Sequence, residues 1–284
     1  MKTIIYSPKP ALSNPQSFFL QSIKDIQNSW ELSVAIAKRD LSAMYRQSIL
    51  GYVWAFLPIL ATTGIFLFLK SGGAFDTGSS NLPYSVYILV GSLLWQVFVD
   101  AVTGPLKVVN ASRSMIVKIN FPRESLVIAA MLITIFNLFI RCIILIPALV
   151  YFHYSHIYEF TPNTLYLFPV GIFGLILLGY CIGLFLTPIG LLYKDIQMGI
   201  TMVMGFWMFM SPVVMAPQEG ISKTIMAWNP ASSVIDVSRA WLLGVEPYFL
   251  KQFLIFTPLS GLLLLMAWVL YRVALPHAIS RLGM

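Results

Sequence analysis

The stretch that decides the fold is "AKRDLSAMYRQSILGYVWAFLPILATTGIFLFL", from Ala37 to Leu69. Its first part carries the basic residues Lys38, Arg39 and Arg46, whereas no charged residue occurs from Gln47 to Leu69. A helix needs about 20 mainly apolar residues to cross the hydrocarbon core of a bilayer. This stretch therefore predicts a basic helix at the membrane surface that leads directly into a membrane-spanning helix.

The whole chain has the composition of an integral membrane protein. Of its 284 residues, 58% are hydrophobic and 10% are charged, whereas about 25% of the residues of a soluble domain are charged. Cys142 and Cys181 both lie in apolar runs, where we expect small buried side chains and no disulfide. The N-terminal segment lacks the apolar run of a signal peptide, so we expect it to remain uncleaved.

Six stretches are long and apolar enough to span the membrane: Gly51 to Leu69, Tyr84 to Thr103, Leu126 to Phe152, Leu165 to Tyr193, Ile196 to Val214 and Phe253 to Tyr271. Lipid offers the backbone no hydrogen-bond partner, so uncharged stretches of this length must be helical. The alternating pattern of barrel strands is absent from the sequence. We therefore expect an all-α integral membrane protein with six transmembrane helices, in which residues 1–284 form a single transmembrane domain.

Basic residues favour the cytoplasmic side of a membrane protein, so their positions predict its orientation. With the N-terminus inside, thirteen of the 18 lysines and arginines fall in segments that would face the cytoplasm, and four fall outside. The remaining one, Arg141, lies within a predicted span. We expect a multi-pass protein with both termini in the cytoplasm. Its net charge of +7 then reflects the inner membrane surface, and no nucleic-acid partner is needed to explain it.

The segment before the first span, residues 18–48, predicts an amphipathic helix. Its apolar residues recur at intervals of three and four: Phe19, Ile23, Ile26, Trp30, Val34, Ala37, Leu41 and Met44. Basic residues lie off this stripe, as in helices that lie in the plane of the lipid headgroups. Two interpretations stay open: the helix is a simple membrane anchor, or it forms an entrance platform for an amphiphilic cargo.

Two segments outside the spans predict short helices. The cytoplasmic segment 104–124, "GPLKVVNASRSMIVKINFPRE", mixes basic and aliphatic residues, which fits either docking into a partner or a plain positive-inside loop. The outer segment 215–250 predicts two helices, near Ile221 to Trp228 and Pro230 to Leu243, with Asn229 as an N-cap and Gly244 as a stop. These helices either dip into the outer leaflet or form a surface hairpin.

Arg141 needs a reason to lie within a span. A basic residue at the centre of a transmembrane helix costs about 2.5 to 3.5 kcal/mol on insertion scales, so it must face protein or water. It either forms a structural pair with a carboxylate or a carbonyl, or it attracts an anionic part of a cargo. Gly179 and Gly183, in "GYCIG", predict a close helix contact.

Neither a nucleotide site nor a catalytic centre is visible in the sequence. The stretch "GGAFDTGSS" matches two glycines of a phosphate-binding loop, but Ser79 stands where lysine is required. His153, His156 and Glu159 are spaced as zinc ligands can be, or they form a polar rim at the membrane surface. Since no nucleophile with a base and no carboxylate pair is present, we expect no catalysis, no metal and no cofactor in this chain.

Four motifs together resemble a known family. "AKRDLSAMYRQSILGYVWAFLPIL", "INFPRE", "LYKDI" and "WNPASSVIDVSRAWLLG" are similar, in this order, to signatures of the permease subunits of type-2 ABC exporters, above all those that export O-antigen, capsule or teichoic-acid polysaccharides. The resemblance implies that two copies of the chain form a channel in the bacterial inner membrane. Two copies of a separate ATP-binding subunit, with ATP and magnesium, would drive export of an undecaprenyl-diphosphate-linked polysaccharide drawn from the membrane lipid.

The resemblance also assigns roles to residues of this sequence. The amphipathic helix becomes a gate helix, with the residues Lys38, Arg39, Tyr45 and Arg46. The cytoplasmic segment becomes a coupling helix that contacts the ATP-binding subunit through Arg113, Met115, Ile116 and Lys118. Aromatic rings stack on sugars, so we expect these residues, together with Arg141, to contact the substrate in the channel: Tyr52, Trp54, Phe56, Phe206 and Trp207.

Three other functions stay open. A type-2 ABC exporter of drugs or lipids would have the same helices, although the aromatic content of 14% and the match around the first span favour a polysaccharide. A membrane-embedded glycosyl or phosphoryl transferase would need carboxylates or a metal site near one face of the membrane. A purely structural assembly subunit would need no ATP-binding partner.

Overall fold

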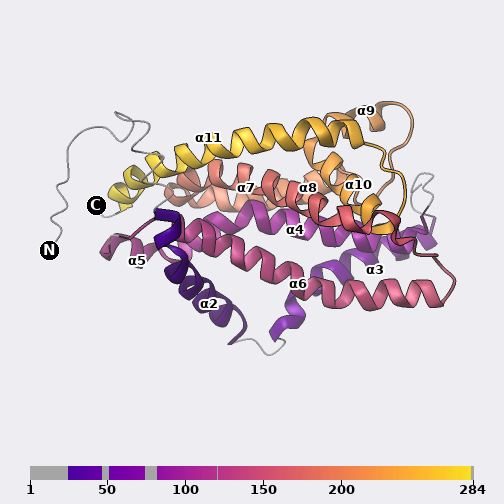
Figure 1. Cartoon of the computed structure of the whole chain (residues 1–284), viewed down its shortest axis with the longest axis horizontal. Helices are drawn as coiled ribbons and strands as arrows, with labels where there is room; N and C mark the ends of the chain where they lie inside the picture. Colours follow the sequence, from indigo (N-terminus) through magenta and orange to yellow (C-terminus); the bar gives the residue numbers. More distant parts are fainter. Residues whose placement is uncertain (1–24, 47–50, 74–81, 120, 283–284) are drawn as a thin grey trace.

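The structure is a computed structural model that describes residues 25–46, 51–73, 82–119 and 121–282. Within these ranges the chain folds into helices and contains no strand (Figure 1). Four helices are long and apolar enough to cross a membrane: α4 (Tyr84–Ala111), α6 (Glu124–Tyr154), α7 (Phe168–Leu192) and α11 (Leu250–Leu282). The prediction of an all-α, multi-pass membrane protein is confirmed at this level.

The other two predicted spans form shorter helices. Helix α3 (Leu57–Ser71) has 15 residues, and helix α8 (Lys194–Phe209) has 16. At 1.5 Å per residue they measure about 22 to 24 Å, less than the hydrocarbon thickness of about 30 Å. A short 3-10 helix, η1 (Gly51–Ala55), precedes α3, and a turn follows α8 at Met210. The count of six spans therefore stays a prediction.

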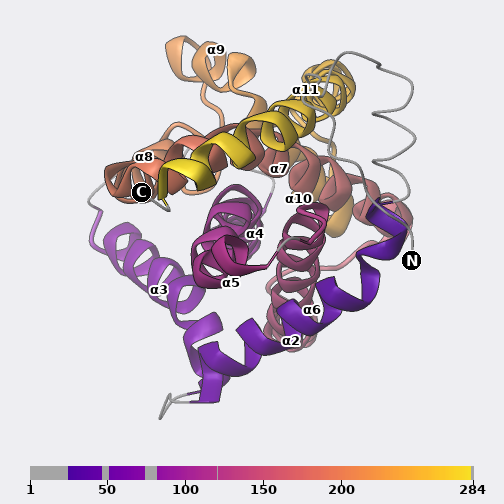
Figure 2. The ribbon, with the colours of Figure 1, turned by 90° about the vertical axis from the view of Figure 1, so that its left-hand side faces the viewer.

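Helix α4 occupies the centre of the bundle, with α7, α6, α3, α8 and α10 packed around it (Figure 2). Glycines set the closest of these contacts, since a Cβ atom added to Gly183 would lie 2.5 Å from the carbonyl oxygen of Val102. A Cβ atom added to Gly179 would collide with the side chain of Ala101 in the same way. The predicted close contact at "GYCIG" is confirmed, and it joins α7 to α4.

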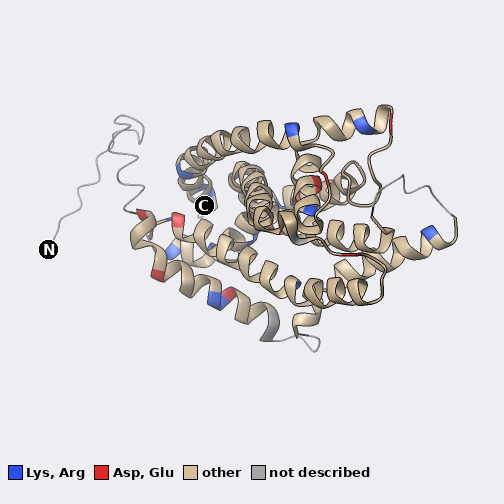
Figure 3. Cartoon of the chain, turned by 45° about the vertical axis from the view of Figure 1, so that its right-hand side comes forward, with Lys and Arg blue, Asp and Glu red and all other residues tan. Residues whose placement is uncertain are grey.

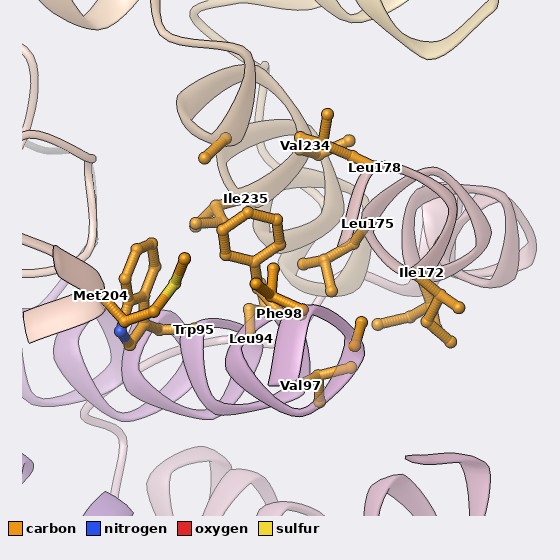
Figure 4. Packing of buried hydrophobic residues seen from close by; sticks show 14 of the residues in the cluster. Leu94, Trp95, Val97, Phe98, Ile172, Leu175, Leu178, Met204, Val234 and Ile235 are labelled. Carbon is orange, nitrogen blue, oxygen red and sulfur yellow. The ribbon is translucent and has the colours of Figure 1, made fainter. Parts of the chain in front are cut away.

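Apolar side chains from several helices fill the interior of the bundle. Figure 4 shows Phe98 of α4 beside Leu175 of α7 and Ile235 of α10 (Pro230–Leu243), and all three are fully buried. The indole ring of Trp207 on α8 meets the ring of Phe98 edge-on, with 5.5 Å between the ring centroids. Contacts with aromatic and aliphatic side chains of α4 therefore hold α7, α8 and α10 in place.

The outer helices have the predicted boundaries: α9 spans Ile221–Trp228 and α10 spans Pro230–Leu243. The side chain of Asn229 accepts a hydrogen bond from the backbone N–H of Ala231, which makes it the N-cap of α10. Gly244 ends α10 in the left-handed conformation, with φ at 73°. Helix α10 is buried in the protein over twelve of its 14 residues, whereas α9 exposes Ile221 and Trp228.

A buried polar network joins α10 to α4. Arg239 of α10 donates hydrogen bonds to the carbonyl oxygen of Pro212, at 2.7 Å, and to the hydroxyl of Tyr87, at 3.0 Å. Its neighbour Asp236 lies 3.5 Å away and accepts a hydrogen bond from the backbone N–H of Phe249. Burial raises the pKa of Asp236, and the positive charge of Arg239 opposes this shift. This network fixes α10 at the end of the bundle opposite to α5.

The end of the bundle that holds α5 (Arg113–Lys118) also holds α2 (Trp30–Arg46) and the last turns of α11. Charged residues lie toward both ends of the bundle, whereas the long helices are uncharged over most of their length (Figure 3). Of the segment 104–124, residues up to Ala111 extend α4 beyond the predicted span, and only α5 is a separate short helix. Residues 18–24 and 47–48 of the predicted amphipathic helix lie outside the described residues.

Candidate functional site

Two neighbouring helices carry polar residues in their apolar middle sections. Helix α4 has Gln96 and Asp100, and α6 has Asn137 and Arg141. Residues four positions apart lie on the same face of a helix, so each pair forms part of a polar stripe. Helices α4 and α6 pack against each other, and the two stripes meet between them.

An ion pair lies at the centre of this contact. Nη2 of Arg141 lies 2.8 Å from Oδ2 of Asp100, and the same oxygen accepts a hydrogen bond of 3.0 Å from Nδ2 of Asn137. Only 6% of the side chain of Arg141 is exposed. Of the two interpretations of Arg141, the structure shows the geometry of a carboxylate pair, which removes the cost of an isolated charge inside the bundle.

The ion pair lies in the wall of a cavity of about 690 Å³. The cavity is bounded by α2, η1, the start of α3, α4 and α6. On α4 its lining runs from Ala111 to Gln96, which is about 22 Å at 1.5 Å per residue. Since Ala111 lies at the α5 end of the bundle and Gln96 near the middle of α4, the cavity leads from one end into the interior, and polar side chains lie along a mainly apolar wall.

The charges in the cavity wall balance one another. Four charged residues line it: Asp40 of α2, Asp100 and Lys107 of α4, and Arg141 of α6. Asp40 is held by its neighbour Arg39, whose Nη2 lies 2.7 Å from Oδ1 of Asp40. The four charged side chains that line the cavity therefore carry no net charge together.

Only two of the predicted substrate contacts line this cavity. Trp54 and Arg141 both line it. Tyr52 lies in the wall of a second, more apolar groove of about 740 Å³ between α2 and α6, with its ring centroid 6.4 Å from that of Phe136. Phe56 is half-buried just before α3. Helix η1 therefore places Trp54 in the wall of the cavity and Tyr52 in the wall of the groove between α2 and α6.

The two aromatic residues predicted on α8 lie elsewhere. Phe206 is 67% exposed on the surface of the bundle. Trp207 points into the interior, where its Nε1 donates a hydrogen bond of 3.0 Å to Oδ1 of Asn229. Within one chain these residues do not join Trp54 and Arg141. Their predicted contact with substrate stays a prediction.

Helix α2 packs against α6 through small side chains. Ser33 and Ala37 are buried, whereas Trp30, Val34 and Met44 of the apolar stripe are exposed. The predicted stripe is therefore split between two surroundings: Ala37 packs against the bundle and Leu41 is half-buried, so a helix that lies on the lipid surface stays a prediction.

The basic residues assigned to the gate helix differ in their surroundings. Arg39 ties the helix to the start of α5, because its Nη2 donates a hydrogen bond of 2.8 Å to Oγ of Ser112. Lys38 is exposed and lines the second groove. The side chains of Tyr45 and Arg46 lie outside the described part of the chain.

Helix α5 has one face on the bundle and one face in the open. Met115 and Ile116, two of the predicted contacts with an ATP-binding subunit, are half-buried and pack against the core. Lys118 is exposed, and Arg113 is half-buried. Val117 and Ile119 expose 49% and 59% of their surface, and they form the free apolar face of this segment.

Sequence reasoning missed the residues that surround Arg141. Asp100 lies inside the predicted second span and carries an intramembrane charge, as Arg141 does, while Gln96 and Asn137 each lie four positions from one of these charges. An opposite charge in each of two apolar spans, each with an amide partner four residues away, was the available signal. Among the described residues, no three His, Cys, Asp or Glu side chains are placed to hold a metal ion.

Comparisons with known proteins relate the chain to one kind of protein. Three similar proteins all carry the name O-antigen export system permease protein RfbA. One, from Klebsiella pneumoniae, is 24% identical over 211 residues, or 72% of this chain and 78% of the relative. Another, from Myxococcus xanthus, is 21% identical over 227 residues, or 78% of this chain and 84% of the relative.

The third relative, also from Klebsiella pneumoniae, is 23% identical over 225 residues, which cover 77% of this chain and 83% of the relative. No protein-family model matches the chain. The resemblance inferred from the four motifs is confirmed by these relatives: the chain is similar to permeases of O-antigen export systems.

Proposed function

We propose that this chain is the membrane permease subunit of an ABC exporter that carries a polysaccharide of the O-antigen type across the bacterial inner membrane. The similarity to three O-antigen export permeases over more than 70% of the chain is the observation that carries the proposal. Four long apolar helices and a cavity with polar side chains that reaches the middle of the bundle are consistent with a transport protein. The names of the relatives favour a polysaccharide over a drug or a lipid.

In this proposal two copies of the chain form the channel, and six helices of each copy cross the membrane. We place the contact between the copies at the two short helices, which expose large apolar side chains as the sides of α6 and α11 do. On α3 these include Ile65 and Phe68, and on α8 they include Met202 and Phe206. A second copy packed on these helices would bury the apolar surface and would bring Phe206 toward the channel.

The energy for transport would come from ATP and magnesium bound by a separate subunit. The exposed apolar pair Val117 and Ile119, next to the exposed cation of Lys118, gives that subunit a contact on α5. Helix α5 continues from α4 through Ser112, and Met115 packs against the core. A displacement of α5 would therefore pass to α4 as a rigid-body movement.

Helix α2 would act as the gate helix at the cytoplasmic surface. Its exposed apolar stripe would lie in the inner leaflet, where an undecaprenyl-diphosphate-linked polysaccharide resides. The polar cavity opens beside it, between α2, η1, α4 and α6. A lipid-linked substrate could then leave the bilayer at α2 and bring its polar part to the cavity without crossing the apolar core.

Deletion of the gene in its bacterial host tests the proposal. We expect surface polysaccharide to disappear while the lipid-linked polymer accumulates inside the cell, and a plasmid copy of the gene should restore export. Purified chain should hydrolyse ATP only when it is combined with its ATP-binding subunit. Unchanged surface polysaccharide in the deletion strain, or ATP hydrolysis by the chain alone, would refute the proposal.

A further inference from the structure

Several buried polar atoms in the cavity wall have no hydrogen-bond partner among the described residues. They are Nε and Nη1 of Arg141, Oδ1 of Asn137 and Oδ2 of Asp40. Arg141 and Asn137 expose 5% and 9% of their surface. Leaving a buried donor or acceptor without a partner costs about 1 to 3 kcal/mol, so three residues in the wall of one cavity have unused capacity to bind a ligand.

The chemistry of these atoms selects the kind of ligand. Arg141 offers two N–H donors, whereas Asn137 and Asp40 offer oxygen acceptors. A hydroxyl group both donates and accepts a hydrogen bond, so a ligand with several hydroxyl groups can satisfy all three residues. The cavity therefore matches a ligand that carries many hydroxyl groups.

A phosphate or diphosphate group matches these atoms less well. It would accept hydrogen bonds from Arg141, but it would lie near the carboxylate of Asp100, which is 2.8 Å from the same guanidinium. Asp40 and Lys107, in the same wall, add one further negative and one further positive charge. A fully ionised phosphate also has no proton to donate to Asn137 or Asp40. The balanced charges thus favour an uncharged ligand over an anion.

The remaining walls of the cavity fit a sugar. Trp54 lines the cavity from η1 and is 54% exposed, so its ring is accessible for stacking on the C–H face of a sugar. The volume of about 690 Å³ lies within the range of about 300 to 1,000 Å³ that is typical of small-molecule sites. Donors, acceptors and an aromatic ring are the groups that an uncharged carbohydrate requires.

We infer that the cavity between α4 and α6 is a binding site for an uncharged segment of glycan, held by Arg141, Asn137 and Asp40 and stacked on Trp54. All of these residues belong to a single chain. The inference rests on the proposed function and deepens it, because it assigns the sugar part of the substrate, rather than its diphosphate, to this cavity.

Photo-crosslinking in polysaccharide-producing cells tests the inference with the full chain and its ATP-binding partner. Ile133 lines the cavity, whereas Ile143 lies on the outer surface of the same helix and is 65% exposed. With a benzoylphenylalanine in place of Ile133, we expect light-dependent attachment of glycan, detected by periodate staining of the protein band. At position 143 we expect attachment of phospholipid alone. Phospholipid without glycan at position 133 would overturn the inference.

A second experiment separates sugar from phosphate as the occupant. An Ile133→Cys variant, in a chain whose Cys142 and Cys181 are replaced by alanine, is reconstituted with its partner and treated with a water-soluble thiol reagent. We expect polysaccharide fragments cut from the host's own polymer to slow its modification and inorganic pyrophosphate to leave it unchanged. Protection by pyrophosphate alone would assign the cavity to the diphosphate, and protection by neither would refute a ligand site.

Failure of this inference is distinguishable from failure of the proposed function. Where the gene deletion abolishes export but position 133 captures no glycan, only the cavity assignment is wrong. Where the deletion leaves surface polysaccharide unchanged, the proposed function itself is wrong.

Discussion

Arg141 of α6 and Asp100 of α4 form an ion pair of 2.8 Å, in which 6% and 17% of the respective side chains are exposed. The two residues are far apart in the sequence, and their contact joins two of the long apolar helices near the middle of their lengths. Because each charge is largely removed from solvent, each depends on the other. Loss of either charge alone should therefore destabilise the fold, whereas loss of both together should cost little.

Removal of one partner of this pair should destabilise the protein strongly. Arg141→Met leaves the carboxylate of Asp100 without its counter-charge, and breaking a buried pair in this way costs about 3 to 5 kcal/mol. The double variant Asp100→Asn with Arg141→Met removes both charges and should recover most of that loss. The melting temperatures of the detergent-solubilised variants, monitored by size-exclusion chromatography after heating, measure the difference in stability between the single and the double variant.

The double variant also separates stability from transport. If the cavity serves the substrate, the stable double variant should still export less polysaccharide, because the charged donors of Arg141 are gone. Full export by this variant at a normal protein level would show that the pair is structural only. A double variant as unstable as Arg141→Met would contradict the ion-pair argument.

Asn229 should be the most sensitive residue between α8 and α10. Its side chain accepts hydrogen bonds from Trp207 and Ala231 and donates to the carbonyl oxygen of Met210. Asn229→Ala removes the N-cap of α10 and leaves the indole N–H of Trp207 without its partner, so we expect a loss of about 1 to 3 kcal/mol. Thermal unfolding measures it, with the exposed Asn163→Ala as the control, whose effect should stay within about 0.5 kcal/mol. Equal losses of stability in the Asn229→Ala and Asn163→Ala variants would refute the role of Asn229 between α8 and α10.

Gly183→Ala should loosen the contact between α4 and α7. The added methyl group would lie 2.5 Å from the carbonyl oxygen of Val102, so the helices must separate, and overpacking of this kind costs about 1 to 3 kcal/mol. Gly199→Ala on α8 is the matched control, because no atom lies within 4 Å of its added Cβ. Alanine is the better helix former, so the control should be neutral or slightly stabilising. Comparable melting temperatures for both variants would contradict the packing argument.

Ile119→Asp should weaken assembly with the ATP-binding subunit. Ile119 is 59% exposed beside the exposed Val117, and a carboxylate in the centre of an apolar contact is poorly tolerated. We expect co-purification to fall by about tenfold, which corresponds to about 1.4 kcal/mol. Ser114→Asp places the same charge on an exposed, polar position of α5 and should have a smaller effect. Undiminished assembly of the Ile119→Asp variant would place the partner elsewhere.

Local signals in the sequence predicted the outer helices well. The boundaries of α9 and α10 follow from Asn229, Pro230 and Gly244, because capping depends on residues that are close together in the chain. Four of the six apolar spans became long helices for a similar reason, since length and hydropathy are local properties.

Long-range contacts account for what the sequence did not reveal. The pairing of Arg141 with Asp100 depends on how two helices pack, and Asp100 was overlooked within its apolar surroundings. Aromatic residues were the least predictable part of the candidate site. Trp54 and Trp207 look alike in sequence, but one lines a cavity and the other donates a hydrogen bond in the interior.

The glycine contact between α4 and α7 makes these two helices a rigid pair. With Gly179 and Gly183 pressed against Ala101 and Val102, the two helices cannot slide without steric collision. Helix α10, tied to α4 by Arg239, must travel with them. In the proposed transporter, α4, α7 and α10 would therefore move together as one rigid unit.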